Sequence, residues 1–148
     1  MCITDAALEN NTLSIDLRYS WTNSSVSFNV ITQGAPVLNS GVLWPSKDES
    51  SFYSWAGEQS TLSNISLVPV PTNDLWRFDV NGQGGGTWQS SSVPSDFVRT
   101  SSSQYTSGGD VGYILGGYVS DRTSPDNRLL GGWQMSPGMV SYNMTTGA

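Results

Sequence analysis

Short stretches of alternating apolar and polar residues run along most of the chain, a pattern typical of half-buried β-strands. Between residues 11 and 19, for example, Leu13, Ile15 and Leu17 alternate with polar residues. On this basis the sequence predicts nine strands, at residues 11–19, 21–31, 37–44, 52–56, 75–80, 87–91, 101–106, 113–115 and 139–144.

Two of the connections between these strands predict hairpins. Residues 45–50, Pro-Ser-Lys-Asp-Glu-Ser, are turn formers that follow strand 37–44 and precede strand 52–56. Residues 81–86 include four glycines, which take positive φ without a Cβ penalty and can therefore reverse the chain after strand 75–80.

Two segments of the chain share one layout, which indicates a repeat architecture. In residues 51–79 and again in residues 110–143, a strand ends in small residues, a long polar loop follows, and a further strand carries an aromatic residue before Asp or Asn. Gly57 and Gly117 are 60 residues apart, and other landmarks give spacings of 64 and 67. The repeat period is therefore in the low sixties.

The residues of this layout resemble the kelch repeat of β-propellers. Their sequence is similar to that of secreted or cell-surface kelch proteins of filamentous fungi, which resemble the central domain of galactose oxidase. The motif positions are Ala56, Gly57, Phe78, Asp79, Trp88, Gly116, Gly117 and Tyr142. The resemblance implies small residues where inner strands approach closely, aromatic rings between neighbouring blades, and a turn-stabilising role for Asp79.

The resemblance predicts an all-β fold, a kelch-type β-propeller fragment of about two to two and a half four-stranded antiparallel blades. About residues 10–33 would form the second half of one blade, 35–92 a complete blade and 98–148 the first three strands of a third. So few blades cannot close a ring. We therefore expect a fragment, a truncated gene product, or self-association through exposed blade edges.

Composition agrees with a β protein of one domain. Of the 148 residues, 36% are hydrophobic and only 12% are charged, and Gly and Ser are abundant, so we expect almost no helix. The net charge is −6 and the six basic residues are scattered, which argues against nucleic acid and anionic membranes as partners. No apolar segment is long enough to predict a membrane span.

N-glycosylation sequons favour an extracellular or cell-surface location, whereas the first residues of the sequence argue against it. Cys2 is the only cysteine, so no internal disulfide can form. N-glycosylation sequons occur at Asn10, Asn23, Asn64 and Asn143. The first residues lack the pattern of a signal peptide. These observations agree if the chain is part of a longer secreted protein.

The absence of histidine removes most catalytic possibilities. Without imidazole the chain cannot form a Ser-His-Asp system or, alone, the copper site of galactose-oxidase-like enzymes. We therefore predict no metal, no cofactor and no enzymatic activity. Paired carboxylates remain conceivable, with these candidates at strand ends: Glu58, Asp74, Asp79 and Asp121. One alternative is a fragment of an extracellular propeller enzyme, galactose-oxidase-like or a glycosidase, whose catalytic residues lie outside this chain. Another is a degenerate remnant without activity.

The strongest indication of function is the length of two loops, residues 58–72 and 118–137. In kelch propellers such loops share one face, and loops on a rigid scaffold commonly carry recognition. We expect this face to bind protein or carbohydrate through a mixed polar and aromatic set: Glu58, Tyr118, Asp121, Arg122, Arg128 and Trp133. A glycan on Asn64 would crowd that face. Three tryptophans are expected in the core, Trp21, Trp76 and Trp88; three lie nearer turns and could either pack or stack on sugar, Trp44, Trp55 and Trp133.

Overall fold

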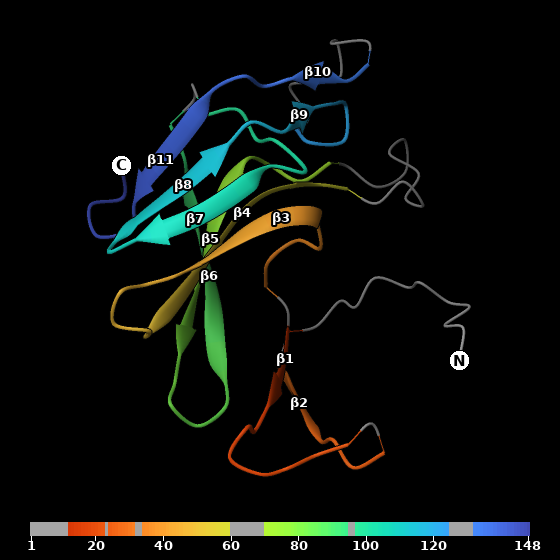
Figure 1. Cartoon of the computed structure of the whole chain (residues 1–148), viewed down its shortest axis with the longest axis vertical. Coiled ribbons are helices and arrows are strands. Elements are labelled where there is room, and N and C mark those ends of the chain that lie inside the picture. The colour runs from red at the N-terminus through yellow and green to blue at the C-terminus, as the bar shows by residue number, and fades with distance from the viewer. Residues whose placement is uncertain (1–11, 23, 32–33, 60–69, 95–96, 125–131) are drawn as a thin grey trace.

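The computed structural model describes residues 12–22, 24–31, 34–59, 70–94, 97–124 and 132–148. In these parts of the chain every regular element is a β-strand, and the strands form antiparallel sheets of two to four strands (Figure 1). The predicted all-β class is confirmed. Over the same residues no helix has the length and apolar character needed to cross a bilayer.

The largest unit is a four-stranded sheet in which the strands lie in chain order. Its strands are β3 (Asn39–Pro45), β4 (Ser51–Glu58), β5 (Asp74–Val80) and β6 (Gly86–Ser92). Both hairpins predicted from the turn residues are present, because β3 pairs with β4 and β5 pairs with β6. Phe78 and Trp88 face each other across β5 and β6 with ring centroids 5.1 Å apart, a typical cross-strand aromatic pair.

A three-stranded sheet follows, in the order β11-β8-β7. Its strands are β7 (Gln104–Gly108), β8 (Val111–Leu115) and β11 (Met139–Asn143). Between β8 and β11 the chain makes a small pair of strands, β9 (Tyr118–Val119) with β10 (Gln134–Met135). Sequence reasoning missed this pair, because strands of two residues carry no alternation to detect.

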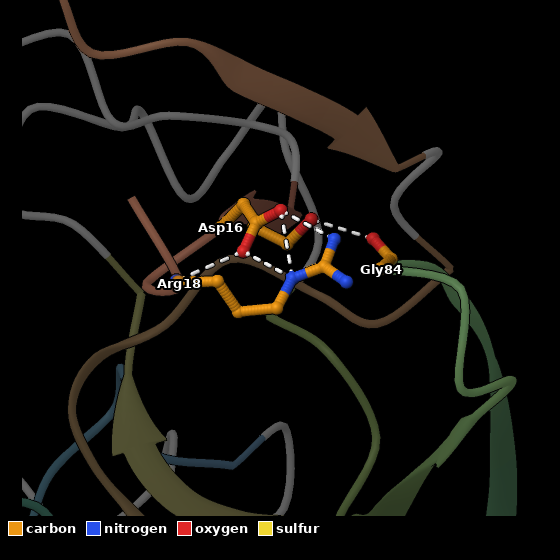
Figure 2. Close-up of polar contacts among 4 residues, drawn as sticks. Asp16, Arg18 and Gly84 are labelled. Carbon is orange, nitrogen blue, oxygen red and sulfur yellow. Dashed lines mark hydrogen bonds and ion pairs between the residues drawn. The ribbon is translucent and has the colours of Figure 1, made fainter. Parts of the chain in front are cut away.

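The N-terminal hairpin consists of β1 (Thr12–Ile15) and β2 (Phe28–Ile31), both shorter than predicted. It is fastened to the turn between β5 and β6, since Ser14 Oγ donates to the carbonyl oxygen of Gly84 at 2.5 Å and Asn29 Nδ2 donates to the same oxygen at 2.8 Å. Figure 2 shows this region, where Asp16 and Arg18 form an exposed ion pair. An apolar cavity of about 330 Å³ lies between the hairpin and the four-stranded sheet.

The core lies between the four-stranded and three-stranded sheets. Trp44 of β3 is almost fully buried, and a Cβ on Gly112 of β8 would lie only 2.4 Å from its ring. Tyr53 of β4 packs against Tyr142 of β11, with ring centroids 6.2 Å apart. The two sheets therefore meet face to face through aromatic rings on one side and a small residue on the other.

The distribution of tryptophan over core and surface differs from the prediction. Trp44 and Trp55, which the sequence left open, belong to the buried core cluster. Trp21, expected in the core, is exposed between β1 and β2. Position next to a turn is a poor guide to burial, because the side of the sheet to which a ring points depends on strand register.

Gly57 of β4 and Gly117, between β8 and β9, share a backbone conformation and a crowded setting. Their φ angles are +90° and +91°, a conformation that glycine adopts without strain. A Cβ on Gly57 would lie 2.7 Å from the carbonyl oxygen of Asn39, and one on Gly117 would lie 2.3 Å from Ser103 Oγ. The absence of a side chain thus lets Gly57 approach Leu38 and Asn39, and lets Gly117 approach Ser101 and Ser103.

We expect Gly112→Ala to destabilise the protein by about 1–3 kcal/mol, because the added methyl group overlaps the Trp44 ring in a close-packed interface. Urea unfolding followed by tryptophan fluorescence measures the change. Gly138→Ala is the matched control, since a Cβ there meets nothing within 4 Å. Equal stabilities of the two variants would contradict this account of the sheet interface.

Candidate functional site

Three segments that are distant in sequence meet beyond the ends of β4 and β8. The Gly57 amide donates to the Thr100 carbonyl at 2.8 Å, and the Gln59 amide donates to the Arg122 carbonyl at 2.9 Å. Ser101 forms an antiparallel bridge with Tyr118 through two backbone hydrogen bonds. The starts of both long loops therefore lie side by side, joined by the segment that connects the two larger sheets.

An aromatic stack forms the exposed part of this region. The rings of Tyr118 and Trp133 lie 4.8 Å apart between centroids and are nearly parallel, at 7°. Pairing of β9 with β10 places Tyr118 opposite Met135, so Trp133 is its diagonal neighbour and within reach of its ring. Trp133 is 74% exposed. Since one face of its ring rests on Tyr118, the opposite face is directed to solvent.

Glu58 accepts a hydrogen bond from Tyr118, the less exposed of the two stacked residues. The Tyr118 hydroxyl donates to Glu58 Oε1 at 2.7 Å, which joins the last residue of β4 to the first residue of β9. Burial, and next the hydrogen bond to this carboxylate, raises the pKa of Tyr118 above its ordinary value of 10. The phenol therefore stays neutral and keeps donating throughout the physiological range.

Beneath the stack lies a layer of buried polar side chains, which we call the buried polar layer. It consists of Gln59, Arg99, Thr100, Ser101, Ser120, Thr123 and Ser124. Elsewhere in the described parts of the chain only Ser51 is both polar and buried. Within this layer the Thr123 hydroxyl donates to the Ser120 carbonyl and accepts from the Ser120 amide, whereas Ser101 Oγ is buried and makes no hydrogen bond among the described residues.

Arg99 is the centre of this layer and was not identified from the sequence. Only 1% of its surface is exposed. Its guanidinium donates to the Thr123 carbonyl, to the Thr72 carbonyl at 3.0 Å and to the Pro71 carbonyl at 2.7 Å. Burial lowers the pKa of Arg99 to about 10, against an opposing effect of Asp74. One cation therefore fastens both long loops through their backbones.

The structure brings together three of the predicted binding residues, Glu58, Tyr118 and Trp133. Arg122 reaches the same region through its backbone contact with Gln59, and Asp121 lies partly buried in the adjacent turn. Arg128 lies outside the described residues, as do the sequons at Asn10, Asn23 and Asn64. Asn143, at the end of β11, accepts hydrogen bonds from the backbone amides of Thr145 and Thr146.

Two of the candidate carboxylates, Asp74 and Asp79, lie far apart on the same strand. Asp79 lies at the opposite end of β5 from Asp74 and accepts hydrogen bonds from Ser51 Oγ and Arg77 Nη2, each at 2.8 Å. Although burial opposes the effect, these bonds lower the pKa of Asp79. Asp74 accepts from the Thr72 hydroxyl. Over the described residues, no group of three or more acidic, histidine or cysteine side chains could hold a metal ion.

No protein-family model, curated protein or solved structure matches this chain. The features of the described structure that bear on function are the stack of Tyr118 and Trp133, the Glu58 carboxylate bonded to it, and the buried polar layer.

We expect Arg99→Lys to destabilise the protein by about 2–3 kcal/mol, because a single ammonium cannot reproduce the three-sided guanidinium contact and leaves buried carbonyl groups unsatisfied. Thermal and urea unfolding measure the loss. Arg18→Lys is the control, since Arg18 forms an exposed ion pair and its replacement should leave stability unchanged. Equal behaviour of the two variants would show that Arg99 does not tie the loops.

We expect Tyr118→Phe to lower stability at neutral pH by about 1 kcal/mol, the contribution of one hydrogen bond. Because folding raises the pKa of Tyr118, its contribution is complete below pH about 10 and is lost as pH rises through the folded pKa. The difference between wild type and variant should therefore shrink in alkaline solution. Urea unfolding at a series of pH values measures it, with Tyr105→Phe, an exposed tyrosine of β7, as control. A difference that grows with pH would contradict the assignment.

Proposed function

We propose that the chain is a non-enzymatic recognition module that binds a protein or carbohydrate ligand through the surface formed by Glu58, Tyr118 and Trp133. The observation that carries the proposal is the exposed Trp133 ring, which lies flat on Tyr118 with its other face free for a ligand. Trp and Tyr dominate the energetics of binding surfaces, since each offers a large contact area with few rotatable bonds.

Preorganisation of this surface supports a role in binding. The Trp133 ring rests on Tyr118, Tyr118 is hydrogen-bonded to Glu58, and the chain below is fixed by the buried polar layer. Ordering of flexible side chains is one of the main costs of association, and a surface that is already ordered avoids part of it.

The wider setting of this module is part of the same proposal. We place it in a kelch-type propeller exposed outside a cell, with the described sheets as blades. The shared backbone conformation and crowded setting of Gly57 and Gly117, 60 residues apart, support the repeat on which that interpretation depends. The aromatic packing between the two larger sheets is likewise consistent with neighbouring blades.

The proposal is tested by applying the purified chain to an array of glycans and extracellular proteins. We expect Trp133→Ala to reduce binding of the selected ligand by about tenfold or more, as for a central aromatic contact. Trp21→Ala is the matched control, because Trp21 is also exposed but lies between β1 and β2. Ligands whose binding is insensitive to Trp133→Ala, or a chain that retains no ligand, would count against the proposed site.

A further inference from the structure

Other parts of the same chain contact the four-stranded sheet on both faces. On one face, Trp44 and Tyr53 pack against the three-stranded sheet. On the other face, the indole nitrogen of Trp88 donates to Thr12 Oγ1 of hairpin β1–β2 at 2.8 Å. The three units thus form successive layers, with the hairpin and the three-stranded sheet at the two ends (Figure 1).

The outer face of the three-stranded sheet carries both apolar and polar side chains, and no other described part of the chain forms a sheet against it. Because neighbouring residues of a strand point to opposite faces, Gly112 and Ile114 face the four-stranded sheet and the alternate residues of β8 face away. The apolar members of this outer face, which we call the sheet end face, are Val111, Tyr113, Leu115 and Met139. The same face also carries polar residues: Gln104, Thr106, Ser141 and Asn143. Leu115 is 56% exposed and Met139 is 65% exposed.

The positions of the four-stranded sheet that correspond to Tyr113 and Leu115 are buried. Tyr113 and Leu115 lie 60 positions after Tyr53 and Trp55, the offset that relates Gly117 to Gly57. Tyr53 and Trp55 are buried, since Tyr53 packs on Tyr142 and Trp55 packs on Phe97. The sheet end face is therefore the counterpart of the surface that the four-stranded sheet buries against the next layer.

Hairpin β1–β2 leaves an apolar face exposed at the opposite end of the layers. Leu13 pairs with Val30 and Ile15 pairs with Phe28, so these four side chains share one face, which we call the hairpin end face. Thr12 and Ser14 lie on the other face and make the hydrogen bonds to the four-stranded sheet. Phe28 is 52% exposed and Val30 is 60% exposed.

Neither end layer carries the charges that usually keep exposed strands apart. The strands of the three-stranded sheet contain no Asp, Glu, Lys or Arg, and neither do β1 and β2. Soluble proteins commonly place charged residues on such strands to prevent association. The described charges nearest in sequence to these strands are Asp16, which follows β1 and pairs with Arg18, and Asp110 in the turn between β7 and β8.

We propose that the sheet end face of one molecule binds the hairpin end face of a second copy of the same chain, in a head-to-tail arrangement. A second copy fits because one chain carries both the sheet end face and the hairpin end face. In the proposed contact the three-stranded sheet of one copy would be followed by the hairpin of the next, so that the order of hairpin, four-stranded sheet and three-stranded sheet would repeat. Such an interface is heterologous, so that it can add further copies until a ring closes or an open chain forms.

Sedimentation velocity from about 10 μM to about 1 mM, a range that covers weak to moderate association, tests the proposal. We expect the wild-type chain to form species larger than a monomer as concentration rises, and added salt not to dissociate them. Leu115→Lys on the sheet end face and Phe28→Lys on the hairpin end face should each give monomers. Met135→Lys is the control, an exposed apolar residue of β10 outside both faces, and should associate like the wild type.

Mixing the two monomeric variants gives the decisive result. Leu115→Lys keeps an intact hairpin end face and Phe28→Lys keeps an intact sheet end face, so an equimolar mixture should form a one-to-one dimer and nothing larger. Circular dichroism confirms that each variant keeps its strands. Wild-type chain that stays monomeric throughout, association that survives both substitutions, or a mixture that stays monomeric would each overturn the proposal.

Discussion

The close approach of the Trp44 ring to Gly112 is the contact on which the arrangement of the two larger sheets depends. A side chain at residue 112 would overlap the Trp44 ring, in the same interface where Tyr53 packs against Tyr142. The indole nitrogen of Trp44 has no hydrogen-bond partner in the described structure, which costs about 1–3 kcal/mol. The large area that the ring buries outweighs this cost and keeps Trp44 in place.

The two ends of this interface are stabilised by different forces. Around Trp44 the packing is apolar, whereas beyond the strand ends the buried side chains are hydroxyls, an amide and the guanidinium of Arg99. Buried polar groups need defined partners at defined angles, and so they order a loop more specifically than apolar contacts do. This difference explains how an exposed ring such as Trp133 can be held in one orientation at the end of a long loop.

Part of the candidate site was predictable from local sequence. Glu58 and Tyr118 directly follow apolar strands ending in small residues, and the loops after them are long, which directed attention to Trp133 as well. The bond between Glu58 and Tyr118 was not predictable, since it joins residues 60 positions apart. Arg99 gave no signal at all, because an isolated arginine before a run of Ser and Thr resembles any solvated loop residue.

By itself the sequence determined the all-β class, the approximate positions of nine strands, and the two hairpins, because alternation and turn chemistry act between neighbours in the chain. Tertiary structure alone decided which tryptophans are buried, that Arg99 joins both loops, and that Tyr118 and Trp133 stack. Those outcomes depend on which face of each strand meets another sheet and on contacts between segments far apart in the chain. Local alternation distinguishes the two faces of a strand but does not say which other sheet or which distant segment each face meets.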